Sequence, residues 1–209
     1  MEEGGDGGQS LRGRYVVVLS GKRKSGKDYF ADVLKKRLGD AACIVRLSGP
    51  LKRAYAEEHG LDYQRLLDAS DFKEKYREDM IAWGEARRRH DHGFFCRRAV
   101  QEVPAACRVV IVSDARRKTD VAWFEERRDA AARGVPTVFV RIGATLAART
   151  ARGWAFTANV DDAESECSLD DYTGFDVLVE NSGGDADNVD EAILDIMQRA
   201  RAATNTAAL

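Results

Sequence analysis

A glycine-rich loop between an apolar run and an amphipathic stretch constrains this chain more than any other feature of its 209 residues. The loop spans residues 21–28 (GKRKSGKD), after the apolar run 15–19 and before a helix-like stretch over 29–34. A buried strand, a loop with two glycines and a helix, in this order, form the phosphate-binding loop of P-loop NTPases. Backbone N–H groups and the helix N-terminus would surround the phosphates, and Lys27 would reach the β- and γ-phosphates.

Asp28 stands where this loop usually has Ser or Thr, and it has two interpretations. Its carboxylate could bind Mg²⁺ directly or through water, because carboxylate oxygen suits that hard ion. Alternatively, the loop could be degenerate and inactive. The neighbouring cations Lys22, Arg23 and Lys24 would be unusual in a degenerate site. We therefore favour a working loop that binds ATP with Mg²⁺.

Composition narrows the class of protein. The formal net charge of −2 argues against a general nucleic-acid binder, which is normally basic. The cysteines, at positions 43, 96, 107 and 167, form no Cys-x-x-Cys pair and indicate reduced thiols rather than disulfides or a zinc site. The sequence shows no transmembrane run and no secretory signal. The expected location is therefore the cytosol, and the expected partners are small molecules rather than nucleic acid or membrane.

Apolar strand-like runs alternate with helix-like patterns along the chain. Buried strands are predicted over 15–20, 43–47, 108–113, 137–142 and 176–180, and helices over 27–38, 51–59, 71–89, 94–103, 121–133 and 189–201. This order predicts an α/β fold, with three layers, in which helices flank a central, mostly parallel sheet and ligands bind at the carboxyl ends of the strands. We expect a disordered tail over 1–13, a single domain over 14–203 with a lid over about 143–174, and a frayed C-terminus over 204–209.

The predicted helix 71–89 has two distinct faces. At 100° per residue, one face carries Phe72, Tyr76, Met80 and Trp83 and is suited to the core. The neighbouring face is a basic stripe with a glycine gap that could admit a ligand, made of Lys73, Arg77, Gly84 and Arg88. For an isolated helix such a stripe would indicate only a solvated face.

Further cations lie near the expected strand ends, and they favour an anionic ligand. Arg116 and Arg117 follow one strand, Arg141 closes the next, and Arg152 precedes Gly153-Trp154. In a chain without net positive charge, so many strand-end cations indicate a site for more than one phosphate. Asp114, at the end of an apolar run, is either a Walker-B aspartate that orients Mg²⁺ or an ordinary turn residue.

Together these segments resemble the animal-type phosphomevalonate kinases. The resemblance rests on residues 21–28 (GKRKSGKD), 47–52 (LSGPLK), 58–61 (EHGL), 93–97 (GFFCR), 113–117 (SDARR), 152–154 (RGW) and 160–167 (VDDAESEC). It implies a P-loop fold like that of nucleoside-monophosphate kinases. It also implies conversion of ATP and 5-phosphomevalonate into ADP and 5-diphosphomevalonate with Mg²⁺, a step toward isoprenoids and sterols.

The resemblance also implies roles for individual residues. ATP would be bound by Arg152 on the lid side, by Ser182 and by the loop residues Lys22, Arg23, Lys24, Ser25, Gly26, Lys27 and Asp28, with Asp28 also the metal ligand. Catalytic roles at the transferring phosphate would fall to Lys22, Arg23, Lys27, Arg116, Arg117 and Arg141. The acceptor would be bound by Lys52, Lys73, Arg77, Arg88, Arg97 and Asn181. The chain departs from the relatives at Ser182, where they carry His.

The chemistry of a phosphate acceptor agrees with this composition. A phosphomonoester is largely dianionic at neutral pH, so its oxygen needs no general base, but two polyanions must be brought together by cations. A kinase for a neutral hydroxyl would need a carboxylate near that hydroxyl. A kinase for another small metabolite remains the alternative among enzymes, and a non-catalytic ATP-binding sensor the alternative outside them. The acidic residues of segment 161–166 either pair with the arginines of an empty site or form a solvated lid. A monomer is expected.

Overall fold

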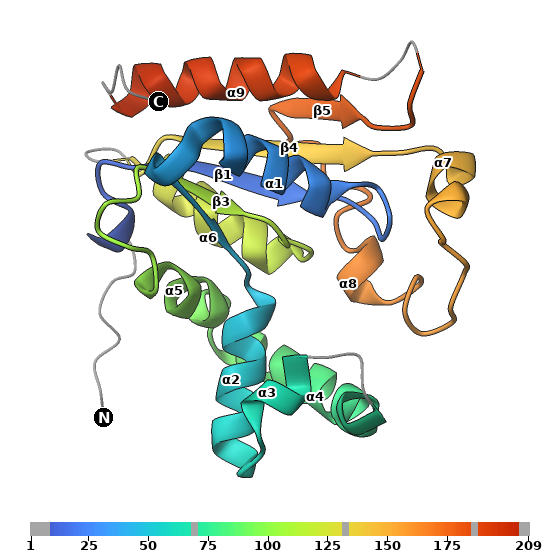
Figure 1. Cartoon of the computed structure of the whole chain (residues 1–209). Helices are drawn as coiled ribbons and strands as arrows, with labels where there is room; N and C mark the ends of the chain where they lie inside the picture. The colour runs from blue at the N-terminus through green and yellow to red at the C-terminus, as the bar shows by residue number, and fades with distance from the viewer. Residues whose placement is uncertain (1–8, 68–70, 131–133, 185–187, 205–209) are drawn as a thin grey trace.

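The core of the protein is one parallel sheet. We analysed a computed structural model that describes residues 9–67, 71–130, 134–184 and 188–204. The strands follow the order β2-β3-β1-β4-β5 with every neighbouring pair parallel, and β1, β4 and β5 point the same way in Figure 1. Their bounds are β1 (Tyr15–Ser20), β2 (Ala42–Val45), β3 (Val109–Val112), β4 (Thr137–Gly143) and β5 (Val177–Glu180). The predicted α/β fold with a parallel sheet is confirmed.

Helices cover both faces of the sheet. α1 (Lys27–Leu38) and α9 (Val189–Thr204) pack on one face, where Phe30, Leu34 and Ile193 meet alternate residues of the strands. α5 (Phe94–Gln101) and α6 (Lys118–Arg128) pack on the other, with Trp123 and Phe124 among the buried side chains. Because the central strands are buried on both faces, their sequences are continuous apolar runs rather than alternating ones.

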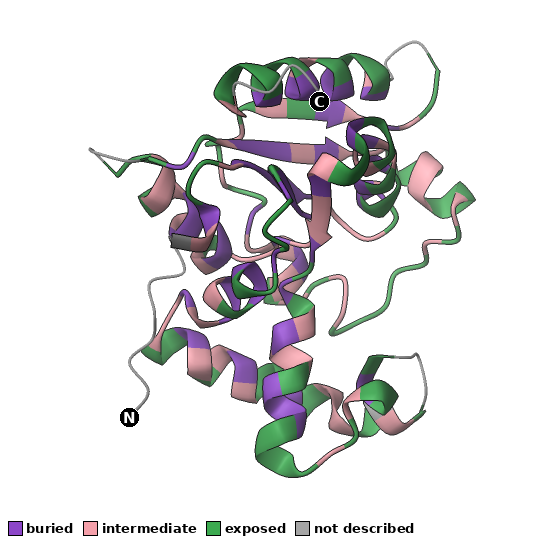
Figure 2. Cartoon of the chain, turned by 60° about the vertical axis from the view of Figure 1, so that its left-hand side comes forward, coloured by how far each residue is buried: buried purple, intermediate pink, exposed green. Residues whose placement is uncertain are grey.

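A helical arm leaves the sheet after β2. It consists of α2 (Ser48–His59), α3 (Tyr63–Leu67) and α4 (Asp71–His90), and it projects away from the sheet in Figures 1 and 2. The arm has its own apolar cluster, in which Met80 and Trp83 of α4 pack with Tyr55. This confirms the predicted apolar face of α4. The glycine gap predicted on α4 is wrong as a ligand entrance, because a Cβ at Gly84 would lie 2.9 Å from Leu51 Cδ1.

The segment between β4 and β5 carries two short helices, α7 (Leu146–Ala151) and α8 (Glu164–Cys167). In Figure 1 both lie beyond the carboxyl ends of the strands, the edge where ligands bind in parallel sheets. The sequence patterns predicted neither helix, nor α3, because each is shorter than two turns and offers no clear periodicity.

The predicted boundaries need small corrections. The helix predicted from residue 51 begins at Ser48, and the helix predicted over 121–133 begins at Lys118 and ends at Arg128. The disordered tail predicted through residue 13 does not reach that far, since Gln9–Leu11 form a 3-10 helix (η1) and Leu11 is fully buried. A second 3-10 helix, η2, spans Gly39–Ala41. Residues 1–8 and 205–209 lie outside the described residues, and Thr204 still belongs to α9.

Candidate active site

The glycine-rich loop joins β1 to α1 as the sequence predicts, and its conformation depends on Gly26. Gly26 has a φ of 93°, in the left-handed region, and α1 begins at the next residue, Lys27. A Cβ at Gly26 would lie only 1.9 Å from Asn181 Nδ2. Only glycine therefore fits here, because the position requires both a positive φ and a close approach of another chain segment.

Lys27 is buried at the start of α1. Its side chain is 7% exposed, and its Nζ lies 3.7 Å from Asp28 Oδ1. Burial lowers the pKa of the Lys27 ammonium, an effect that the nearby carboxylate of Asp28 partly offsets. Asp28 itself is 69% exposed. A bound phosphate would supply the negative charge that the buried ammonium lacks.

Three cavities lie in a row along the edge formed by the loop. The P-loop cavity, of about 370 Å³, is lined by Lys22, Lys24, Lys27, Asp28 and neighbouring loop residues, together with Tyr29, Arg116 and Arg152. The α9 cavity, of about 900 Å³, shares Gly26, Tyr29 and Arg152 with it. The α4 cavity, of about 620 Å³, shares Arg23 and Arg116 with it. The P-loop cavity is thus the junction between two larger spaces.

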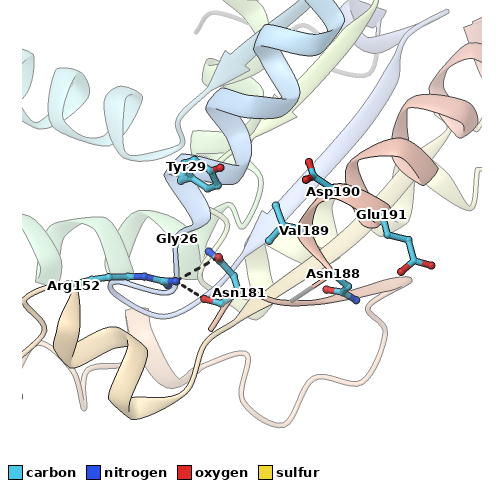
Figure 3. Close-up of a pocket in the computed structure, with 8 residues that line it drawn as sticks. All are labelled: Gly26, Tyr29, Arg152, Asn181, Asn188, Val189, Asp190 and Glu191. Atoms are coloured by element: carbon cyan, nitrogen blue, oxygen red, sulfur yellow. Dashed lines mark hydrogen bonds between the residues drawn. The ribbon is translucent and has the colours of Figure 1, made fainter. Parts of the chain in front are cut away.

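The α9 cavity lies on the side of the loop away from the helical arm. Figure 3 shows Tyr29 of α1 and Arg152 on one side, and Asn188, Asp190 and Glu191 at the start of α9 on the other. The cavity thus opens beside the N-termini of both α1 and α9.

Asn181 and Arg152 tie the loop to the neighbouring segments. Asn181 Nδ2 donates to the Ser25 carbonyl at 2.9 Å, and Arg152 Nη1 donates to the same carbonyl at 3.2 Å. Arg152 Nη2 donates to the Asn181 carbonyl at 2.5 Å. One helical turn earlier, Arg149 Nε donates to the Arg23 carbonyl at 2.8 Å. Segment 149–152 is therefore fastened to the loop through the backbone carbonyls of Arg23 and Ser25.

Ser182 lies just after β5 and contacts the segment that begins α7. Its hydroxyl accepts the Thr145 N–H at 2.7 Å and donates to the Glu180 carboxylate. It therefore joins the end of β5 to the N-terminus of α7, because Thr145 is the N-cap of that helix.

The α4 cavity faces the helical arm. Arg77, Glu74 and Glu78 line it from α4, and residues 157–160 line it from the lid. Arg77 Nε and Nη2 lie 2.6 and 2.5 Å from the two carboxylate oxygens of Glu74. Arg77 therefore lines the same cavity as Arg23 and Arg116. The side chain of Lys73, one turn earlier, lies outside the described part of the structure.

Carboxylates of the lid neutralise the cations around the loop. Asp170 lies 2.5 Å from Lys22 Nζ and 2.9 Å from Arg141 Nη2, and Asp161 lies 2.7 Å from Arg23 Nη1. Glu166 binds the Arg116 guanidinium through one oxygen and accepts the Arg23 backbone N–H at 3.0 Å through the other. Of the two interpretations of the acidic segment, the pairing with arginines is the one observed.

Arg88 and Arg117 belong to a buried network. Arg117 Nε and Nη2 lie 2.6 and 2.5 Å from Glu85 Oε1, and Arg88 Nε lies 3.7 Å from Asp120 Oδ1. Burial lowers the pKa of Arg88 and raises that of Asp120, while their mutual attraction opposes both shifts. Asp120 Oδ2 also accepts the backbone N–H groups of Arg116 and Arg117, both at 3.1 Å.

Two predicted acceptor ligands lie elsewhere, and Asp114 has a structural role. Lys52 lines a separate cavity beside the edge strand β2, and Arg97 of α5 pairs with Asp91. The Asp114 carboxylate accepts the Leu47 and Ser48 backbone N–H groups at 2.6 and 3.1 Å, so it fixes the start of α2. This geometry favours the turn interpretation over a Walker-B ligand.

Sequence reasoning missed several residues of the site. It gave no role to Glu85, Asp120 or Asp170, because each acts through a partner distant along the chain. The acidic run before Cys167 was the available signal, but no periodicity shows which cations it faces. Among the described residues, no group of three or more His, Cys, Asp or Glu side chains could hold a metal ion unaided.

Comparisons with known proteins agree with this geometry. The phosphomevalonate kinase family model matches residues 19–130, which include the loop and the Arg116–Arg117 pair. A phosphomevalonate kinase from Drosophila melanogaster is 42% identical over 185 residues, which cover 87% of this chain and 94% of that relative. This chain belongs to the phosphomevalonate kinase family. As a member of this family it is a kinase, a phosphotransferase with ATP as co-substrate.

Solved structures show more distant likenesses. A Thermus thermophilus protein, TT1252, is 14% identical with a TM-score of 0.48, and the alignment covers 88% of this chain and 97% of that one. An unliganded sugar kinase from Janibacter sp. HTCC2649 is 15% identical with a TM-score of 0.39, over 93% of this chain and 96% of that one. Neither likeness carries an argument about the phosphomevalonate kinase site. Among the described residues, no helix is long and apolar enough to cross a membrane.

Proposed function

We propose that this member of the phosphomevalonate kinase family transfers the γ-phosphoryl group of ATP to 5-phosphomevalonate, giving ADP and 5-diphosphomevalonate for isoprenoid and sterol synthesis. The observation that carries the proposal is the row of three cavities, with the P-loop cavity in the middle. ATP would place its nucleoside in the α9 cavity and its phosphates in the P-loop cavity. The acceptor would approach from the α4 cavity.

In this arrangement, Arg23 and Arg116 stand where the two substrates meet. Both residues line the P-loop cavity and the α4 cavity, so they would contact the transferring phosphoryl group. Charge spreads over that group in the transition state, and fixed cations stabilise it without reorganisation. Lys27, Lys22 and Arg141 would add positive charge from the loop and from β4. The acceptor phosphate needs no base, since it is already anionic at neutral pH.

On the nucleotide side, the geometry refines the roles inferred from the resemblance. Arg152 lines both the α9 cavity and the P-loop cavity, as an ATP ligand should. Asn181 lines the α9 cavity and holds the Ser25 carbonyl. We therefore assign Asn181 to the ATP side, as a residue that orients the loop, rather than to the acceptor. Ser182 would act through its link to the lid helix.

The residues present fit a magnesium ion bound together with ATP. Asp28 lines the P-loop cavity with an exposed carboxylate and would hold the ion directly or through water. When bound, Mg²⁺ neutralises phosphate charge.

On the acceptor side, Arg77 is the cation best placed to bind phosphomevalonate, with Lys73 one turn earlier on the same helix. Arg88 would act through the network that positions Arg117, because it is itself buried. The roles of Lys52 and Arg97 stay predictions, since neither lines the three cavities. We also expect the enzyme to act as a cytosolic monomer on small molecules.

A coupled assay of ADP release tests the proposed reaction. Phosphomevalonate, mevalonate and nucleoside monophosphates would be compared as acceptors with ATP and Mg²⁺. We expect turnover with phosphomevalonate to exceed the others by orders of magnitude. Preference for a different acceptor would favour a kinase for another metabolite, and ATP binding without turnover of any acceptor would favour a sensor.

A further inference from the structure

The carboxylates that pair with cations around the loop differ in how they are held. Asp161 and Glu166 have side chains only 6% and 3% exposed. Trp154 Nε1 and the Thr157 backbone N–H donate to Asp161 at 2.9 Å, and its pKa is lowered because these bonds and Arg23 outweigh the opposing effect of burial. Such a carboxylate is fixed in one place.

Asp170 is held differently. Its side chain is 42% exposed, and it lies in the irregular segment between α8 and β5. One oxygen lies 2.5 Å from Lys22 Nζ, and the other lies 2.9 Å from Arg141 Nη2. The Asp170 carboxylate accepts hydrogen bonds from these two cations, and both cations come from the edge of the sheet where phosphates are expected. An exposed carboxylate between two cations resembles one edge of a phosphate group, because both present two negatively charged oxygens to the cations.

We propose that Asp170 is an internal competitor of substrate phosphate, which occupies the space between Lys22 and Arg141 until a ligand phosphate displaces it. The proposal rests only on the phosphate-binding part of the proposed function. In the free enzyme the Asp170 carboxylate keeps two neighbouring cations paired. When a phosphate arrives, its oxygens take over these contacts and Asp170 turns to solvent. Asp170 therefore sets the affinity of the site without contacting the reacting atoms.

The matched control is the next residue in the chain. Asp171 carries the same charge, is 71% exposed and pairs with Lys118 at 2.7 Å, away from the three cavities. Asp170→Asn and Asp171→Asn remove the same charge from adjacent positions. A general change in surface charge would affect both variants equally, whereas competition at the phosphate site would affect only the first.

Binding of inorganic pyrophosphate, measured by calorimetry, tests the proposal without any turnover. We expect Asp170→Asn to bind pyrophosphate about three- to tenfold more tightly than wild type at low salt, because exposed ion pairs are worth little each. The difference should shrink at high salt, where such pairs are screened. Asp171→Asn should match wild type. Unchanged or weaker binding by Asp170→Asn, or equal tightening in both variants, would overturn the proposal.

Separate titrations identify which substrate phosphate competes with Asp170. ATP is titrated without acceptor, and phosphomevalonate without ATP, in the same three proteins. Tightening confined to ATP assigns the displaced position to its terminal phosphate, and tightening confined to phosphomevalonate assigns it to the acceptor. If Asp170→Asn binds pyrophosphate more tightly than wild type but no substrate is turned over, the proposed reaction is wrong while the proposed competition by Asp170 is supported.

Discussion

Lys27 is a buried cation at the start of α1, with its side chain 7% exposed. Burial lowers its pKa, and the nearby carboxylate of Asp28 is largely exposed to solvent. A cation of this kind interacts strongly with phosphate, because little water screens it. The interaction should be strongest when negative charge builds up on the transferring group, so Lys27 should stabilise the transition state more than the bound substrates.

We predict that Lys27→Met lowers kcat by at least about a hundredfold, the usual cost of losing one strong electrostatic donor. Steady-state kinetics at saturating ATP and phosphomevalonate measures this directly. Lys36→Met is the control, because Lys36 is exposed on the same helix. A Lys27→Met enzyme that retains half of the wild-type turnover would contradict the assignment.

Asp28 is the second residue whose role a single substitution can decide. Asp28→Ser restores the usual residue of the loop and should change the Mg²⁺ dependence of the rate. Asp28→Ala removes the side-chain oxygen altogether and should weaken that dependence further than Asp28→Ser does. The measurement is the rate as a function of free Mg²⁺ at fixed ATP. If both variants keep the wild-type titration and turnover, Asp28 serves only the N-terminus of α1.

At the scale of helices and strands, local pattern was a good guide where elements are long and buried. The strands of the sheet and the helices α1, α4 and α9 follow from continuous apolar runs and from periodicity. The short helices of the lid did not follow, since their positions depend on contacts such as Arg149 with the Arg23 carbonyl, 126 residues apart. For the same reason the cations of the site could be predicted from the sequence, but the carboxylates that pair with each of them could not.

Because α4 lies opposite the lid, we predict that binding of phosphomevalonate depends on side chains of α4 and binding of ATP on side chains of the lid. Arg77→Ala should raise the KM for phosphomevalonate roughly ten- to a hundredfold, because a charge-assisted hydrogen bond is worth about 1.5–3 kcal/mol. The KM for ATP should change little. Arg152→Ala on the lid side should do the reverse. Initial rates with each substrate varied in turn give both constants.

The control for this map is Arg89→Ala, because Arg89 is exposed near the end of the same helix. It should leave both KM values near wild type. If Arg77→Ala raised the KM for ATP and spared the acceptor, α4 would belong to the nucleotide side and the order of the cavities would be wrong.

At the scale of the whole molecule, the acceptor in the proposed arrangement would lie between the helical arm and the sheet, so the arm would have to be held at a fixed distance from the sheet. The network of Glu85 and Arg88 on α4 with Asp120 and Arg117 at the start of α6 makes that connection. Asp120 is 2% exposed and accepts two backbone N–H groups that orient Arg116 and Arg117. Stability of the fold and geometry of the site therefore depend on the same carboxylate.

We predict that Asp120→Ala destabilises the protein by about 3–5 kcal/mol, because it removes a buried carboxylate beside Arg88 and leaves that buried charge with the Glu85 carboxylate, 3.4 Å from Nη1. For a protein of this size the melting temperature should fall by roughly 6–20 °C. Thermal unfolding followed by circular dichroism measures the change. Asp129→Ala, at the exposed end of the same helix, should have almost no effect.

A double variant distinguishes the loss of the ion pair between Arg88 and Asp120 from a simple loss of packing. If the cost of Asp120→Ala comes from the weaker pairing of the buried Arg88 charge, then the double variant Arg88→Met/Asp120→Ala should recover part of the lost stability, since both buried charges are then gone. Its kcat should stay low all the same, because the backbone N–H groups of Arg116 and Arg117 still lack their acceptor. Stability that falls further in the double variant would show that the two side chains contribute independently. Recovery of stability without recovery of turnover would show that one buried carboxylate both connects the arm to the sheet and orients the arginines of the site.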